Sequence, residues 1–87
     1  MKAIILTRGR NTAEQEEKCK IYALEKGYEV LEVVENIGDI TIPLKEQIDV
    51  VIVSHVSRIT RDYLKYLKVE KELREYGVII EVARSRD

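Results

Sequence analysis

The stretch that decides the fold is DVVIVSHVSRITRD, residues 49–62. Residues 50–53 are a run of four β-branched side chains without polar alternation, which is typical of a strand buried on both faces of a parallel sheet. Serine, histidine, threonine and arginine side chains follow at once, and a helix is expected after them. Because ligands of open α/β sheets bind outside the carboxyl ends of the strands, we expect any site of this chain to lie here.

The first half of the chain predicts two more strands with a helix between them. The strands are residues 3–6 and 29–35, both rich in apolar residues. The helix begins at Thr12, which forms a capping-box pattern with Gln15, and it ends before Gly27. Its buried face is expected to include these residues: Ala13, Cys19, Tyr22, Ala23 and Leu24.

The second half predicts a short crossover, a helix and a last strand. In residues 36–48, Gly38 signals a turn and Pro43 can open one short helical turn. The helix runs from about Arg61 to Tyr76, Gly77 caps it, and residues 78–82 form the last strand. The apolar stripe of this last helix is expected to comprise Tyr66, Val69, Leu73 and Tyr76, widened by Leu64 and Leu67.

The order of these elements predicts an α/β domain. A mostly parallel four-stranded sheet with helices on its faces is the arrangement that alternating strands and helices favour. The 87 residues are expected to form one small domain, residues 1–87.

Composition excludes several classes of function. Lys and Arg number 15 against 16 Asp and Glu, and this balance argues against strong non-specific binding of nucleic acid by the whole molecule. With one cysteine, Cys19, and one histidine, His55, we expect neither a disulfide framework nor a metal or other cofactor. No apolar run approaches the roughly 18–20 residues that span a bilayer, and no signal peptide is evident, so a cytoplasmic location without membrane contact is expected.

Four arginines are the candidate site residues. Arg58 and Arg61 are three apart at the entry to the last helix, where they could share one face and bind an anion beside the helix N-terminus. Arg8 and Arg10 leave the first strand at the same edge of a parallel sheet. A phosphate or carboxylate could therefore be bound by all four. The alternative is that these arginines are solvated or paired with the abundant Asp and Glu.

Other polar residues give weaker signals. Ser54, His55 and Ser57 suggest a nucleophile with a base, but neighbours on a strand point to opposite faces and no acid is placed to orient the histidine. We expect a turn histidine without catalytic role, and a small core residue at Cys19. Three tyrosines at helical spacing are expected to serve core packing or an oligomer interface rather than base stacking: Tyr63, Tyr66 and Tyr76.

Three segments, in the right order, resemble the catalytic domain of serine recombinases (resolvases and invertases). Residues 48–62 resemble that family's apolar strand followed by two arginines, here Arg58 and Arg61. Residues 19–30, CKIYALEKGYEV, are similar to its C-x-x-Y-A-x-x-x-G-Y-E-V segment, and residues 64–80 resemble its helix ending in E-x-G-V with a strand after it. The resemblance covers nearly all of the chain. It implies a resolvase-like, flavodoxin-like topology and contacts from the two arginines to DNA phosphates.

The sequence departs from this family at the nucleophile. The family's first strand leads to a serine that attacks the scissile DNA phosphate. Aligned from the first strand, Arg8 matches the family's arginine and Arg10 replaces the serine; aligned backward from Cys19, Arg8 takes the serine position. An arginine stays protonated and cannot act as a nucleophile. Ser57 also stands where the family has an aspartate.

The resemblance and its departures together lead to one interpretation. The crossover is short, and the family's dimerisation helix and DNA-binding domain are not expected in this chain. We expect a serine recombinase-like domain that is catalytically inactive and is associated with DNA recombination or its regulation. The implied partners are DNA, a second copy of the chain, or a recombinase with which it associates. The alternatives are a small phosphate- or nucleotide-binding module and a bare protein-interaction or oligomerisation domain.

Overall fold

Four parallel strands form one sheet in the computed structural model, which describes residues 1–83. They are β1 (Lys2–Leu6), β2 (Glu29–Val34), β3 (Val50–Val53) and β4 (Ile79–Val82). Their order across the sheet is β2-β1-β3-β4, and each adjacent pair is parallel, which confirms the predicted fold class. From β1 the chain adds β2 on one side, and from β3 it adds β4 on the other. The carboxyl ends of β1 and β3 therefore flank the topological switch point of the sheet.

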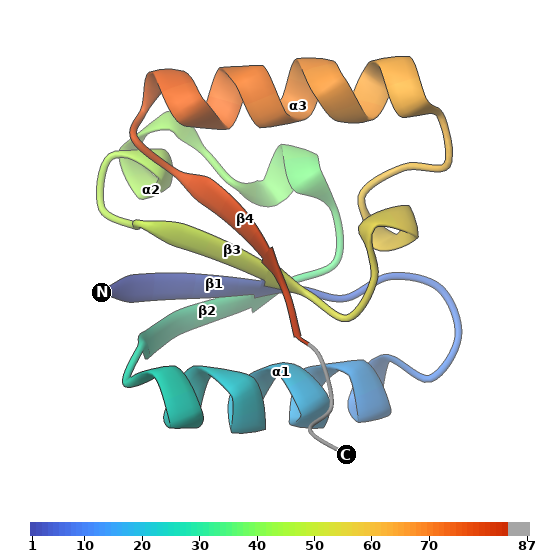
Figure 1. The fold of residues 1–87 in the computed structure, drawn as a ribbon, viewed down its shortest axis with the longest axis vertical. Coiled ribbons are helices and arrows are strands. Elements are labelled where there is room, and N and C mark those ends of the chain that lie inside the picture. Colours follow the sequence, from blue (N-terminus) through green and yellow to red (C-terminus); the bar gives the residue numbers. More distant parts are fainter. Residues whose placement is uncertain (84–87) are drawn as a thin grey trace.

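Helices cover both faces of the sheet (Figure 1). The helix α1 (Thr12–Lys26) lies on one face, below the sheet in Figure 1, and α2 (Ile42–Lys45) and α3 (Tyr63–Glu75) lie on the other. Two single turns of 3₁₀ helix, η1 (Ile37–Asp39) and η2 (Val56–Arg58), complete the connections. The result is a three-layer domain, as the alternation of strands and helices predicts.

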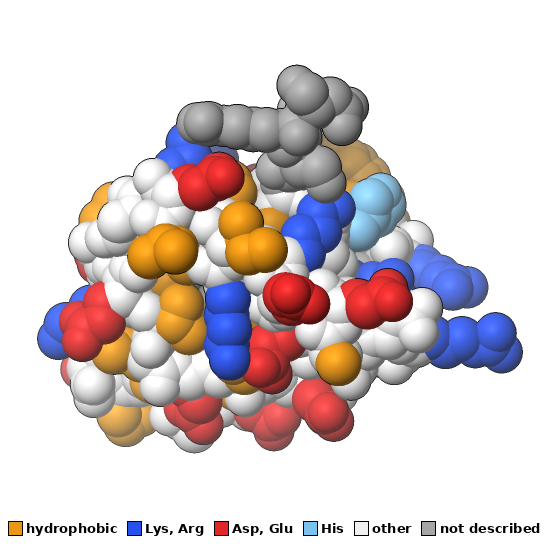
Figure 2. All heavy atoms as spheres, turned by 90° about the horizontal axis from the view of Figure 1, so that it is seen from below, with side chains coloured by type: hydrophobic (Ala, Val, Ile, Leu, Met, Phe, Trp, Pro, Cys, Tyr) orange, Lys and Arg blue, Asp and Glu red, His pale blue; other side chains and the backbone are white. Residues whose placement is uncertain are grey.

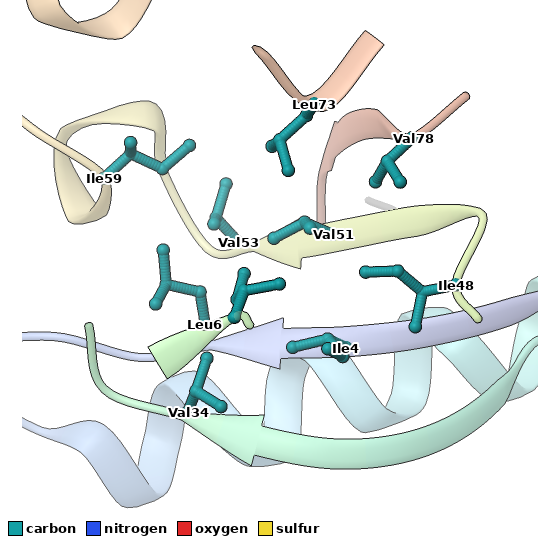
Figure 3. Packing of buried hydrophobic residues seen from close by; sticks show 10 residues of the cluster. Ile4, Leu6, Val34, Ile48, Val51, Val53, Ile59, Leu73 and Val78 are labelled. Carbon is teal, nitrogen blue, oxygen red and sulfur yellow. The ribbon is translucent and has the colours of Figure 1, made fainter. Parts of the chain in front are cut away.

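The two central strands bury their side chains on both faces. Residues of β1 and β3 alternate between a core under α3 and a core under α1, because successive side chains of a strand point to opposite faces. Figure 3 shows the core on the α3 side, where Leu73 and Val78 pack toward Val51 and Val53. Ile59 belongs to the same core and is 2% exposed. It anchors the loop after β3 to the sheet.

Both glycine helix ends and the start of α1 at Thr12 are as predicted, but the capping of that start is not. Gly27 and Gly77 have left-handed φ angles of 75° and 76°, which glycine adopts without strain. The predicted capping box at Thr12 and Gln15 is wrong, because the residue before the helix is Asn11, with φ 59° and no side-chain capping bond. Gln15 is instead buried, at 5% exposure, and bonds to the loop before the helix.

Some expected core residues lie at the surface. Ala13 and Leu24 of α1 are exposed, Leu24 by 81%, and so are Leu64 and Leu67 of α3. The reason is that each helix meets the sheet through a narrow stripe. In α1 this stripe has a spacing of four residues, which keeps its members on one face: Gln15, Cys19 and Ala23.

The short crossover between β2 and β3 packs on the α3 side. Ile40 and Ile48 are buried there, and Lys45 forms an ion pair with Glu72 of α3 at 2.7 Å. Pro43 lies in the first turn of α2, as predicted. In the described part of the chain, no helix is both long enough and apolar enough to cross a membrane.

Candidate functional site

A polar cavity of about 320 Å³ opens at the carboxyl ends of β1 and β3. It lies at the topological switch point, where open α/β sheets bind ligands. Two connections line it, the β1–α1 loop and the loop that carries η2. The lining residues are Arg8, Gly9, Ser57, Arg58, Thr60 and Arg61. Three of the four arginines singled out in the sequence are thus brought together, whereas Arg10 is not part of the lining.

Two arginines tie the loops to one another. The Nη1 of Arg8 donates a hydrogen bond to the carbonyl of Ile59 at 3.1 Å. The Nη1 of Arg58 donates in return to the carbonyl of Arg8, also at 3.1 Å. Each guanidinium group therefore uses one of its five N–H donors to bond the opposite loop. Since Ile59 is fixed in the core, this reciprocal pair also positions the β1–α1 loop.

Gln15 supports this site from α1, a role that the sequence analysis did not foresee when it assigned the residue to a capping box. Its Oε1 accepts from the backbone N–H of Arg8 at 3.0 Å, and its Nε2 donates to the carbonyls of Arg8 and Arg10 at 2.9 and 2.7 Å. The side chain is thus the hydrogen-bond partner of three backbone groups of the loop. The available signal was its spacing, because Gln15 lies four residues before the buried Cys19 on the same helix face.

The close approach of the loops requires glycine at position 9. Gly9 has a φ of 83°, in the left-handed region that residues other than glycine rarely adopt. A Cβ atom added there would lie 3.2 Å from the Nη1 of Arg58. The glycine therefore allows the backbone to turn and leaves room for the guanidinium group of Arg58.

Arg58 and Arg61 reach the cavity differently from the prediction. They do not share a helix face, because Arg58 ends η2 and Arg61 lies in the bend before α3. The N-terminus of α3 is not free for an anion either. The Oδ1 of Asp62 accepts from the backbone N–H groups of Leu64 and Lys65, at 3.0 and 3.3 Å. The positive charge at this cavity therefore comes from the guanidinium groups rather than from the helix end.

None of the four arginines is neutralised by an ion pair in residues 1–83. The ion pairs found there lie elsewhere: Lys20–Glu16, Lys45–Glu72 and Arg74–Glu70. The Nε of Arg58 is buried and has no hydrogen-bond partner among residues 1–83. In Figure 2, seen from the α1 side, Lys and Arg side chains extend from the right-hand end of the molecule, where Figure 1 places the β1–α1 loop. Of the two alternatives for the arginines, pairing with Asp or Glu is thus not observed.

His55 and Ser57 form a local turn. The Nδ1 of His55 accepts from the backbone N–H of Ser57 at 3.1 Å and lies 2.9 Å from its Oγ. One ring nitrogen thus caps η2, which is the structural role expected of a turn histidine. The hydroxyl-bearing Thr7, at the end of β1, is only 2% exposed. In the described residues, no group of three His, Cys, Asp or Glu side chains could hold a metal ion.

Cys19 lies outside this site, in the core beneath α1. It is fully buried and forms no disulfide. Burial raises the pKa of its thiol to about 11, because the charged thiolate is poorly solvated there. The expectation of a small core residue is confirmed.

Comparisons with known proteins identify the fold. No protein-family model and no curated protein matches the sequence. Among solved structures, the chain is similar to the N-terminal catalytic domain of TP901-1 integrase, a serine recombinase domain, with a TM-score of 0.80 and 19% identity. The match covers 95% of this chain and 77% of that one. At this identity the similarity shows the fold alone, and the resolvase-like fold expected from the sequence is confirmed.

Proposed function

We propose that this chain is a serine recombinase-like domain that binds a DNA backbone phosphate and does not cut the DNA. The phosphate would bind in the arginine cavity, the polar cavity at the ends of β1 and β3. One observation carries the proposal. Arg8, Arg58 and Arg61 line a single cavity, and no carboxylate in residues 1–83 pairs with them. Guanidinium groups match the geometry of phosphate oxygens and donate to them in pairs.

The unused donors of Arg58 support the same ligand. A buried N–H group without a partner costs free energy, and within the described part of the chain the Nε of Arg58 is such a group. A small movement of the guanidinium group toward a bound oxyanion would give that nitrogen an acceptor. The bond from its Nη1 to the carbonyl of Arg8 keeps the group at the cavity meanwhile.

The loop after β1 supports the proposed lack of cutting. The resemblance to serine recombinases asks for a serine nucleophile in this loop, and Arg8 and Arg10 occupy the two possible positions. Neither can lose a proton to attack phosphorus. The hydroxyl of Thr7 is buried, and Ser57 comes from the opposite loop, where its backbone and its hydroxyl both lie against His55.

Binding is tested by fluorescence anisotropy with a labelled DNA oligonucleotide at several salt concentrations. Arg61→Ala is expected to weaken binding about tenfold and to lower the salt dependence by about one ion, as removal of one phosphate contact does. Arg74→Ala is the matched control, since it removes the same charge from the far end of α3. Equal losses in the two variants would contradict the cavity as the binding site and leave only a general charge effect.

Cutting is tested with supercoiled plasmid DNA, followed by denaturation to trap covalent protein–DNA adducts. We expect neither nicks nor adducts. An adduct that disappears in Arg58→Ala would overturn the proposed lack of activity. Its loss in Ser57→Ala as well would identify that hydroxyl as the nucleophile.

Regulation through association is the second candidate function. It is favoured by apolar side chains exposed on the α2 and α3 side: Ile42 by 55%, Leu64 by 69% and Leu67 by 39%. A second copy of the chain or a recombinase could cover them, because exposed apolar groups gain free energy on burial. Light scattering over a range of concentrations tests self-association, and a monomer at every concentration would remove it.

A further inference from the structure

A second cavity adjoins the arginine cavity and differs from it in character. Its volume is about 370 Å³, within the range of small-molecule sites. It is lined mainly by apolar atoms, from Val56, Ser57, Thr60, Arg61, Tyr63 and Tyr66. Ser57, Thr60 and Arg61 line both cavities, so the two are neighbours, and we refer to them together as a double hollow with a charged half and an apolar half.

Two tyrosines form the aromatic part of the apolar half. Tyr63 and Tyr66 are three residues apart on α3, which places them on the same side of the helix. Tyr63 is 70% exposed, so core packing, one of the two roles expected from the sequence beside an oligomer interface, is not observed for it. Tyr66 is half-buried against the core, and its hydroxyl donates to Glu70 at 3.3 Å. One ring is thus held by the fold while the other offers a free face.

We propose that this double hollow binds one nucleotide whose base is unpaired. The phosphate would lie on Arg8, Arg58 and Arg61, and the base would enter the apolar half against Tyr63 and Tyr66. Every base has an aromatic face that stacks on tyrosine, and proteins that bind single strands combine such rings with a basic groove. This inference rests on the proposed function, because it uses the same phosphate cavity and adds the class of nucleic acid.

The arrangement favours an unpaired base over a duplex. A base inside a duplex is already stacked between its neighbours and cannot place its face against a protein ring without leaving the helix. An apolar partner alone would satisfy the tyrosines but would leave the guanidinium group of Arg61, at the border of both cavities, against apolar surface. A nucleotide supplies both chemistries at once.

The test compares three fluorescent ligands of equal length and charge per strand in an anisotropy titration. They are an oligothymidylate, the same strand with abasic sites, and the corresponding duplex. We expect the oligothymidylate to bind about tenfold more tightly than the abasic strand, a typical contribution of base–aromatic stacking. Unlabelled thymidine monophosphate as competitor separates two sources: displacement at similar concentration assigns the site to free nucleotides, and weak displacement assigns it to a strand.

Variants of Tyr63 make the result specific. Tyr63→Ala should abolish the preference for the oligothymidylate without changing the affinity for the abasic strand, whereas Tyr63→Phe should keep it. Leu64→Ala is the control, because Leu64 is equally exposed, at 69%, but does not line the cavity. Circular dichroism checks the fold of each variant.

The outcomes separate the two proposals. Equal affinity for the base-containing and abasic strands, or an unchanged preference in Tyr63→Ala, would overturn the base site and leave the phosphate site standing. Failure of every ligand to bind would overturn both.

Discussion

Replacing Gln15 by alanine should release the β1–α1 loop and destabilise the fold. The side chain makes three hydrogen bonds to that loop, at 3.0, 2.9 and 2.7 Å. A hydrogen bond within a protein contributes about 1 kcal/mol net, so the three together contribute about 3 kcal/mol. Arg8 and Arg10 are exposed residues, and water can replace part of this bonding. We therefore expect the free energy of unfolding to fall by about 2–3 kcal/mol.

Urea denaturation followed by circular dichroism measures this change. The midpoint should fall while the slope with urea stays constant, because the surface exposed on unfolding is nearly the same. For a domain of this size, each kcal/mol corresponds to about 4–8 °C in melting temperature. Gln47→Ala is the matched control, since Gln47 is exposed and no hydrogen bond of its side chain is found in residues 1–83; its effect should stay within about 0.5 kcal/mol.

Gln15→Glu tests the direction of the bonds. The carboxylate would keep the acceptor for the Arg8 N–H but would turn a second oxygen toward the two carbonyls that the amide now donates to. At neutral pH this variant should be less stable than Gln15→Ala, because like partial charges repel and the carbonyls lose their donor. A loss below about 0.5 kcal/mol in Gln15→Ala would refute the view that this side chain fixes the loop.

Three further predictions concern other features of the fold. Gly9→Ala should lower the free energy of unfolding by about 1–2 kcal/mol, because an L residue is strained at a φ of 83°. Gly38→Ala is the control and should be neutral in the same urea titration, since no described atom lies within 4 Å of a Cβ added there. Equal effects of the two substitutions would refute the strain at Gly9. Cys19 should react slowly with a thiol reagent at about pH 8 in the native state and rapidly in urea, since its pKa is about 11; fast native reaction would contradict its burial. The hydrogen bond to Glu81 raises the pKa of Tyr28 above 10.0, so this stabilising contribution is complete below that pH and is lost as the pH rises through the folded pKa. Melting temperatures between about pH 9 and 11 should therefore fall less steeply in Glu81→Gln, and parallel curves would contradict the link.

The sequence predicted the sheet well because its signals are local. The β-branched run of residues 50–53 is buried on both faces at the centre of the sheet. The glycines at 27 and 77 end their helices through their own backbone conformations. In these cases the residue's own preference and its place in the fold agree, so a pattern in the sequence was enough.

The details of the site were less predictable because they depend on tertiary contacts. Gln15 has the spacing of a capping-box residue, but its side-chain amide donates to a carbonyl of the β1–α1 loop and does not cap α1. The spacing of Arg58 and Arg61 suggested that they share one helical face. In the structure Arg58 ends the 3₁₀ turn η2, the buried Ile59 follows it, and Arg61 lies outside that turn. The cavity position was predicted from topology, and the side chains that build it were predicted only in part.

For the proposed phosphate ligand, the reciprocal bonds between the two arginine-bearing loops would couple affinity to conformational order. A phosphate would contact both loops at once only in molecules where these bonds are formed, here called braced. The apparent dissociation constant would then be the intrinsic one divided by the braced fraction. If bracing were present in one molecule in ten, affinity would fall about tenfold with every contact residue intact. A substitution such as Gln15→Ala, which does not line the cavity, would then lower affinity by lowering the braced fraction. A saturating ligand would in turn raise the melting temperature of the domain.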